Sequence, residues 1–418
     1  MHPSSSGKKE PKKSKLVTPD VPHELIATQI LVHLPVRSLL RFRCVCKSWH
    51  HTIDNDYFIQ AHLRVRNLSL LVAPLIKNTN DDRGEEFIIA GLHRWDHKRN
   101  PGGAAAATLI HDMADYDHLP FPDKRNAHDL AHCDGLVLLP TDAKVIVLNP
   151  ATRRVLTLPS SPHSVRPPRL PAHIRGHQAF GFGHDLRSSA YKVARFFYRC
   201  DKDGYHCTTG MEVFTLKTDK HWRETAVPPP YPVMAGRTAT FFKGSLLWTA
   251  QASLLPNTQG FIRFNLEDES FSITPPPPTC GPGLDYAASS LAELRGELCL
   301  CVPGQRGADG SSLEMWMCAD LGTNDEAPRW HRRYIIRFAP FCRWRYFRLI
   351  SMLDEEPVFQ AGSDHLVLYG IQNGDGVFND MVSLKDTMYQ NADNDSKHSH
   401  MLVEYIDVIP YVESLVPL

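Results

Sequence analysis

This sequence lacks long apolar runs, cysteine pairs with zinc-site spacing and a net charge. No apolar stretch approaches the ~18–20 residues that span a bilayer as a helix. The ten cysteines are dispersed, and no two have the C-x-x-C spacing that is typical of zinc sites. The 46 basic residues balance 46 acidic ones, so no overall field attracts nucleic acid or a membrane. We therefore expect no membrane partner, no metal, no cofactor, and buried, reduced thiols.

The chain is long enough for more than one domain. Its 418 residues exceed the roughly 250–300 at which a single hydrophobic core stops growing. Residues 1–20 are rich in serine, proline and lysine, and such a segment cannot offset its ordering entropy by burial. We predict a disordered basic tail, either a solvated leader or a nuclear-localisation patch. Because it has no apolar signal-peptide core, we expect the cytoplasm, the nucleus or both.

Residues 21–66 are predicted to be helical. Pro22 suits a first helical position, and apolar residues then recur at three- and four-residue spacing through Leu34. Pro35 ends this helix and can open a second one. A third short helix is predicted through Trp49, ending in the polar stretch at 54–56. We expect Trp49 to be the main filler of a thin core, with truncation costing on the order of 3–5 kcal/mol.

The string VPHELIATQILVHLPVRSLLRFRCVCKSWHHTI, residues 21–53, resembles an F-box. It carries the Leu-Pro-Val-Arg-Ser-Leu-Leu segment and the Cys-Lys-x-Trp end of that family, with Val21 in place of the usual leucine. The resemblance implies docking on a Skp-type adaptor and, through it, on a cullin. The predicted adaptor-binding residues are Val21, Pro22, Leu25, Ile26, Ile30, Leu31, Leu34, Pro35, Leu39, Leu40, Cys44, Val45, Cys46 and Trp49.

Residues 67–418 are predicted to be rich in β-strands. The segment 132–159 has three short strands separated by turn signals, and similar units begin near 179, 238 and 290, with a fainter one at 357–370. A shared apolar–x–Gly–x–Leu kernel recurs at Gly135, Gly244 and Gly296. Repeats of ~40–50 residues, each a four-stranded sheet, predict a β-propeller of about six blades. We expect residues 403–418 to return to the first blade and close the ring.

This region also resembles the F-box-associated domain of plant F-box proteins. The residues that carry the resemblance include NPATRRVLTLP (149–159), GFGHDLRSSAYKVARF (181–196) and FFKGSLLW (241–248). The predicted fold class is α+β multidomain: a three-helix F-box at 21–66, then an all-β propeller-like domain at 67–418. The resemblance implies a non-catalytic substrate receptor of a Skp–cullin–F-box ubiquitin ligase, holding an unknown protein substrate.

Two other classes of function stay open at this point. The chain could be a propeller enzyme or ligand-binding protein whose helices serve oligomerisation, although His23-Glu24 lacks the second histidine of H-E-x-x-H and Ser189–Lys192 matches S-x-x-K without its companion motifs. It could also bind nucleic acid through the basic, aromatic segments 329–337 and 341–348, but half-exposed strands have the same alternation and we favour them.

Several motifs have a packing interpretation that we favour over a ligand site. The F-box resemblance places Cys44 and Cys46 in helix packing rather than at a metal with the nearby histidines. Four tryptophans late in strand runs are predicted to pack in blade cores: Trp222, Trp248, Trp316 and Trp330. Substrate recognition is expected in loops, and three candidates are 159–176, 201–210 and 303–312.

Overall fold

The computed structural model describes residues 23–78, 86–89, 91–95, 106–113, 129–141, 144–164, 178–200, 207–233, 236–249, 260–280, 284, 288–304, 312–322, 326–338, 347–372, 375–390 and 403–418. The chain divides into two compact units, Met1–Val65 and Arg66–Leu418. The predicted tail at 1–20 and the predicted contact residues Val21 and Pro22 lie outside the described residues. None of the described helices is long and apolar enough to cross a membrane.

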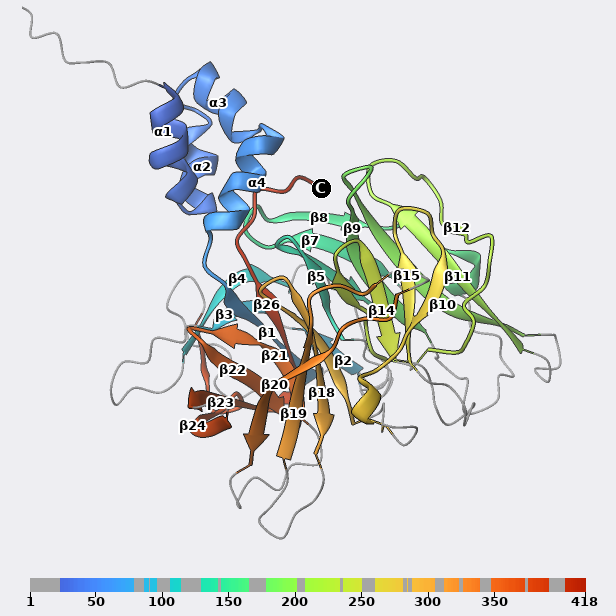
Figure 1. Cartoon of the computed structure of the whole chain (residues 1–418). Coiled ribbons are helices and arrows are strands. Elements are labelled where there is room, and N and C mark those ends of the chain that lie inside the picture. Colours follow the sequence, from blue (N-terminus) through green and yellow to red (C-terminus); the bar gives the residue numbers. More distant parts are fainter. Residues whose placement is uncertain are drawn as a thin grey trace, which may run out of the picture. The chain divides into compact units, whose positions relative to one another are not determined.

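The first unit is helical (Figure 1). Its elements are α1 (His23–Gln29), the 3-10 turn η1 (Leu31–His33), α2 (Val36–Phe42), α3 (Lys47–Ile53) and α4 (Asp56–Val65). Small aliphatic side chains make the core, since Leu31, Val36, Leu39 and Ile53 are all fully buried. The Leu34 carbonyl, at the bend before Pro35, lies 2.9 Å from Nε2 of the buried His62 and so joins the bend to α4.

Two expectations for this unit need correction. The third helix ends at Ile53, just before the polar stretch at 54–56, as predicted, but a fourth helix follows where only three were expected. The Asn55 side chain accepts a hydrogen bond from the Tyr57 N–H at 2.9 Å at the start of this helix. Trp49 is not the main core filler. It is half-buried and meets Phe42 edge-on at 5.4 Å, while the aliphatic side chains of the helices fill the interior.

The second unit is a ring of β-sheets, as predicted (Figure 1). It has six blades, numbered in chain order, and blades 2 to 5 are described first. Blade 2 contains β5 (Ala131–Cys133), β6 (Leu136–Pro140), β7 (Val145–Asn149) and β8 (Arg154–Thr157). Blade 3 contains β9 (Ala179–Asp185), β10 (Ala190–Cys200), β11 (Cys207–Thr215) and β12 (Arg223–Glu224). Blade 4 contains β13 (Thr240–Phe242), β14 (Ser245–Thr249), β15 (Phe261–Asn265) and β16 (Phe271–Thr274). Blade 5 contains β17 (Ser290–Leu294), β18 (Glu297–Pro303), β19 (Ser312–Cys318) and β20 (His331–Arg337).

The two remaining blades lie on either side of the ring closure. Blade 6 contains β21 (Phe347–Leu353), β22 (Glu356–Ala361), β23 (His365–Gln372) and β24 (Asp375–Ser383). Blade 1 contains β1 (Ser69–Asn78), β2 (Glu86–Ile89), β3 (Gly91–Trp95), β4 (Ala106–Asp112), β25 (Met388–Gln390) and β26 (Val403–Tyr411). Strand β26 pairs antiparallel with β1, from Ser69 opposite Tyr411 to Ile76 opposite Val403. The predicted closure by the C-terminal segment is therefore confirmed.

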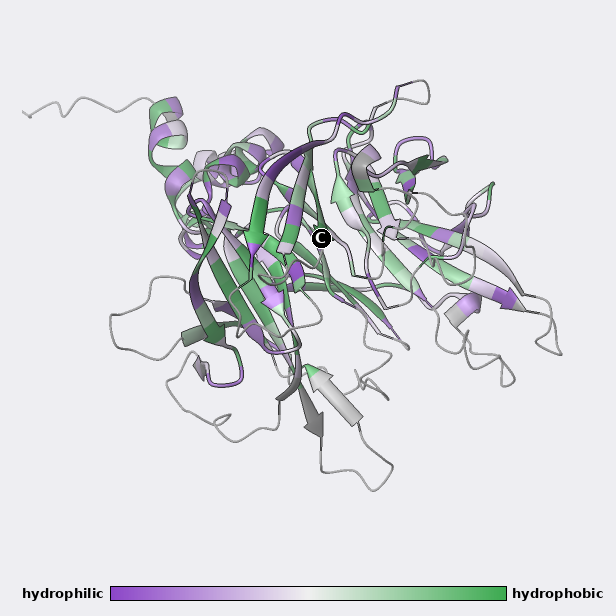
Figure 2. Cartoon of the chain, turned by 60° about the horizontal axis from the view of Figure 1, so that its bottom comes forward, coloured by the Kyte–Doolittle hydropathy of each residue, from purple (hydrophilic) through white to green (hydrophobic). Residues whose placement is uncertain are grey.

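The innermost strand of each blade contacts the next around the ring. Strand β26 contacts β5 and β21, and the series continues from β5 through β9, β13 and β17 to β21. The interior of the blades is apolar because these short strands are covered on both faces. Figure 2 shows this as green, hydrophobic stretches along the strands, whereas the helices carry both green and purple residues.

The glycine kernels found in the sequence are tight hairpins between the first and second strands of a blade. The turn pairs Asp134-Gly135, Lys243-Gly244 and Arg295-Gly296 all have positive φ at both residues, for example 51° and 79° in the first. Two-residue hairpins need this left-handed pair, which glycine adopts at little cost.

Blades 5 and 6 share one eight-stranded sheet, which the sequence did not predict. Their outermost strands, β20 and β24, pair in parallel with Ile335 opposite Asp375 and Ile336 opposite Gly376. A Cβ at Gly376 would lie 2.2 Å from Cδ1 and 3.3 Å from Cα of Ile336, so a larger residue there would require the Ile336 side chain to shift. The two blades also share one hydrophobic core.

Candidate binding surfaces

The helical unit exposes several large apolar side chains. Leu25, Ile30 and Val45 are 50%, 52% and 58% exposed, although side chains of this kind are normally buried in a folded protein. All three lie in the segment predicted to bind an adaptor.

The other predicted contact residues differ in exposure. Pro35, Cys44 and Cys46 are exposed, whereas Ile26, Leu34, Leu40 and Trp49 are half-buried. Leu31 and Leu39 are fully buried, so they would support an adaptor surface only from the core. Whether any of these residues contacts an adaptor stays a prediction.

Helix α4 adds exposed residues that the sequence analysis did not select. Tyr57 is 88% exposed and Val65 is 43% exposed, while Phe58, Ile59 and His62 face inward. The three inward-facing residues have helical spacing, and this pattern could have predicted the helix from the sequence. It was missed because Asp54-Asn55-Asp56 was interpreted as the end of the last of three helices.

Cys44 and Cys46 are exposed and not part of helix packing, contrary to expectation. They lie in the linker between α2 and α3, and Cys46 is the N-cap residue of α3, its Sγ accepting from the Trp49 N–H at 3.5 Å. Among the described residues, no group of three or more histidine, cysteine, aspartate or glutamate side chains could hold a metal ion.

The propeller has a cavity of about 400 Å³ on its axis. Its walls come from the inner strands β5, β13, β17, β21 and β26, with Leu247, Trp248 and Thr249 of β14. Sequence analysis missed this site because its residues come from strands far apart in the chain. No local motif marks it.

Arg348 carries the main charge cluster of this wall. Its Nη1 lies 3.4 Å from Asp129 Oδ2 and its Nη2 lies 2.5 Å from Asp407 Oδ1, with further hydrogen bonds to Gln360 and the Val408 carbonyl. Burial alone would lower the pKa of Arg348, but the carboxylates of Asp407 and Asp129 raise it above its ordinary value. The cluster joins β21, β26 and the segment that enters β5, and so reinforces the closure of the ring.

His132 lies beside this cluster and lines the cavity. Burial, and then the positive charge of Arg348, lower the pKa of His132 to about 4. Its imidazole is therefore neutral at physiological pH, and it can both donate and accept a hydrogen bond.

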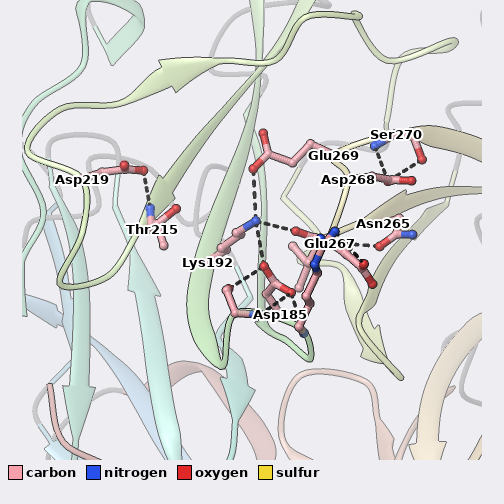
Figure 3. Close-up of polar contacts among 12 residues, drawn as sticks. Asp185, Lys192, Thr215, Asp219, Asn265, Glu267, Asp268, Glu269 and Ser270 are labelled. Atoms are coloured by element: carbon pink, nitrogen blue, oxygen red, sulfur yellow. Dashed lines mark hydrogen bonds and ion pairs between the residues drawn. The ribbon is translucent and has the colours of Figure 1, made fainter.

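A second polar cluster joins blades 3 and 4 (Figure 3). The buried Lys192 Nζ lies 3.1 Å from Asp185 Oδ2 and 3.2 Å from Glu269 Oε1, and it donates to the Leu266 carbonyl. Arg223 also pairs with Glu269. The S-x-x-K match at Ser189–Lys192 therefore supplies a structural cation, held between two carboxylates.

The tryptophans and the basic segment have packing roles. Trp248 and Trp316 are buried, and the indoles of Trp222 and Trp330 donate to the carbonyls of Pro159 and Pro275. Residues 331–337 form strand β20, as favoured, and three of its arginines pair with acidic side chains: Arg332 with Glu314, Arg333 with Glu297 and Arg337 with Asp375. Residues 339–346, and most of the three loops expected to recognise a substrate, lie outside the described residues.

Comparison with known proteins agrees with both units. Residues 108–418 match the family model of the F-box associated beta propeller domain, and residues 20–60 match that of the F-box domain. Among relatives from Arabidopsis thaliana, F-box protein CPR1 is 25% identical over 90% of this chain and 86% of its own length. F-box/LRR-repeat protein At2g43260 is 24% identical over 96% and 83%. F-box protein At3g52320 is 26% identical over 64% of this chain, which spans 62% of that relative.

Among solved structures, a fungal lectin from Aleuria aurantia with a six-bladed β-propeller fold aligns with 76% of this chain and 96% of its own. Its TM-score of 0.36 at 12% identity is too low to carry an argument. The two family matches do carry one, since the propeller model alone covers most of the sequence. The chain belongs to the F-box associated beta propeller family and carries an F-box at its N-terminal end.

Proposed function

We propose that this chain is a substrate-receptor subunit of a Skp–cullin–F-box ubiquitin ligase. The observation that carries the proposal is the set of exposed apolar side chains, Leu25, Ile30 and Val45, within the residues that match the F-box domain. A stable protein interface buries about 800 Å² on each partner, and apolar residues of this size supply its anchors.

In this role the chain makes and breaks no bond itself. It holds a substrate protein and the ligase core together. This raises the effective concentration of a substrate lysine at the place where ubiquitin is transferred. The work would be done in the cytoplasm, the nucleus or both.

Strand topology supports one end of the ring as the substrate-binding end. The two-residue hairpins at Gly135, Gly244 and Gly296 leave little chain exposed at their end. Because successive strands alternate in direction, the connections after β8, β10 and β18 all leave from the opposite end. These connections contain the three loops predicted for recognition, 159–176, 201–210 and 303–312. We therefore infer that the substrate binds at the end opposite the hairpins.

Adaptor binding is tested by copurification with a Skp-type adaptor. The double variant Ile30→Asp/Val45→Asp should lose the complex, because it places two charges in the apolar surface. Leu186→Asp is the control, since Leu186 is a large apolar side chain that is 62% exposed in the propeller unit. A folded double variant that still copurifies with the adaptor would refute this contact surface.

Substrate binding is tested by affinity purification under proteasome inhibition. The full chain is compared with a chain that lacks residues 21–66 and cannot recruit the ligase. Proteins held by both, but depleted by the full chain alone once the inhibitor is removed, are candidate substrates. If no protein is stabilised when the ligase-free chain replaces the full one, the receptor role is contradicted.

A further inference from the structure

The axial cavity has the size and composition of a small-molecule site. At about 400 Å³ it lies within the ~300–1,000 Å³ range of ligand pockets. Apolar side chains form much of the wall, among them Leu247, Trp248, Leu291, Ile350 and Pro410. An apolar wall of this size favours an organic ligand over an ion.

The charges of the wall balance, and each charged side chain already has a hydrogen-bond or ion-pair partner. Its lining includes three acidic and three basic side chains: Asp129, Asp134, Glu293, Arg237, Lys243 and Arg348. Arg348 pairs with Asp129 and Asp407, Arg237 donates to the Ser289 carbonyl, and Lys243 donates to the Ala319 carbonyl.

The acidic side chains are engaged in the same way. Asp134 accepts from the Tyr191 hydroxyl at 2.9 Å, and Glu293 accepts from the Gly296 N–H. Arg237, Lys243, Asp134 and Glu293 have neutral partners, and these two cations and two anions balance. A charged ligand would therefore lose its hydration to a wall with no excess of the opposite charge, and this costs several kcal/mol.

Two polar side chains of the wall are left for a ligand. Within the part of the chain that the structure describes, neither the His132 imidazole nor the Thr249 hydroxyl makes a hydrogen bond, and both line the cavity. Burial and Arg348 lower the pKa of His132 to about 4. At neutral pH the His132 ring is therefore uncharged and offers one donor and one acceptor.

We propose that the axial cavity binds an uncharged, partly apolar small molecule that hydrogen-bonds to His132 and Thr249. Such a ligand would be a co-ligand of the propeller. Its binding does not depend on the adaptor surface, so this proposal and the receptor function can fail separately.

Ligand-observed NMR on the full chain tests the proposal with three probes of one shape. Benzyl alcohol is uncharged, benzoate is an anion and benzylamine is a cation at neutral pH. Benzyl alcohol should bind with a dissociation constant in the millimolar range or tighter, and each charged probe should bind at least about tenfold more weakly.

Variants locate the binding site. His132→Phe keeps the ring but removes its hydrogen bonds, and Thr249→Val keeps the shape but removes the hydroxyl, so each should weaken benzyl alcohol binding about fivefold. His184→Phe is the matched control, because His184 lies on β9 beside Tyr191 and does not line the cavity.

Three results would overturn the proposal. They are no benzyl alcohol binding at millimolar concentration, equal or tighter binding of a charged probe, and unchanged binding by both variants. Should His132→Phe fail to fold, Thr249→Val still decides whether the cavity is the site.

Discussion

At the residue scale, the buried ion pair of Arg195 and Glu212 is the feature whose loss of one partner we expect to destabilise the fold most. The two residues are opposite each other on β10 and β11, and their side chains are only 2% and 3% exposed. Ser161 donates to Glu212 at 2.8 Å, and the Arg195 guanidinium lies 5.3 Å from the centre of the Trp222 ring. The pair is stable only while both charges are present.

We expect Glu212→Ala to lower the free energy of unfolding by about 3–5 kcal/mol, because it leaves the buried guanidinium without a counter-charge. Urea denaturation measures this. Glu224→Ala in the same blade is the control: its pair with Arg199 is 42% and 52% exposed, so the loss should stay below about 1 kcal/mol. Equal losses in the two variants would show that burial does not govern the cost.

Asp185 gives the protein a specific sensitivity to acid. Burial alone would raise its pKa, but hydrogen bonds from Ser188, Lys192 and two backbone N–H groups lower it to about 2. Since the unfolded value is near 4, Asp185 stabilises the fold above about pH 4, and this contribution is lost as the pH falls through about 2.

We therefore expect Asp185→Asn to be less stable than the natural protein by about 2–3 kcal/mol at pH 7, with the difference shrinking toward zero near pH 2. Urea titrations at several pH values measure it. Asp268→Asn serves as the control, because Asp268 is exposed and accepts from Ser270 two residues away. A difference for Asp185→Asn that does not change between pH 7 and pH 2 would contradict the assignment.

At the element scale, two hairpins of the same type separate backbone strain from packing. Gly135 and Gly296 have φ of +79° and +85°, so alanine is strained at both. A Cβ at Gly135 would lie 2.3 Å from the Val412 carbonyl oxygen, whereas a Cβ at Gly296 has nothing within 4 Å.

We expect Gly296→Ala to cost about 1–2 kcal/mol, which is the left-handed strain alone. Gly135→Ala should cost at least about 2 kcal/mol more, because the segment after β26 must move away. Thermal unfolding of the two variants measures the difference. If they melt at the same temperature, the segment after β26 does not pack against this turn.

The same hairpins explain what the sequence could predict. A glycine after a polar residue between two apolar runs is a local signal, and it located the first hairpins of blades 2, 4 and 5. Blade 6 makes the equivalent turn with Asp354 and Glu355, without glycine, and its unit was correspondingly fainter. Strand β5 is too short, at three residues, to show a pattern of its own.

Contacts between distant segments left no such signal. The exposed apolar residues of the F-box could be selected in advance because they lie in one continuous motif. The axial cavity and the Arg348 cluster could not, since Asp129, Arg348 and Asp407 meet only after the ring has closed. The parallel pairing of β20 with β24 depends on a close approach at Gly376, which the sequence does not distinguish from any other glycine.

At the scale of the whole molecule, the ring depends on its last strand. Removing 401–418 takes away the inner strand of blade 1, with Ile406, Val408, Ile409 and Tyr411 all buried. Burial of four such side chains is worth roughly 6–12 kcal/mol. The free energy of unfolding of most domains is only about 5–15 kcal/mol.

We expect a chain ending at His400 to have no cooperative thermal transition, or one that is lower by more than about 10 °C. Calorimetry compares it with the full chain and with a control that lacks residues 1–20. A transition as sharp and as high as that of the full chain would show that β26 is dispensable.

The position of β26 also sets the order of events on the ribosome. Strand β1 emerges early, but its antiparallel partner is synthesised only after the other five blades. At ~5–20 residues per second, the open edge waits on the order of tens of seconds. During that interval the nascent propeller presents one unpaired edge of β1, whose other edge can pair with β2 and β3, to chaperones and to neighbouring chains. The F-box helices are by then already complete. A mutation that stops synthesis late in the message would thus leave a finished docking module attached to a receptor that cannot mature.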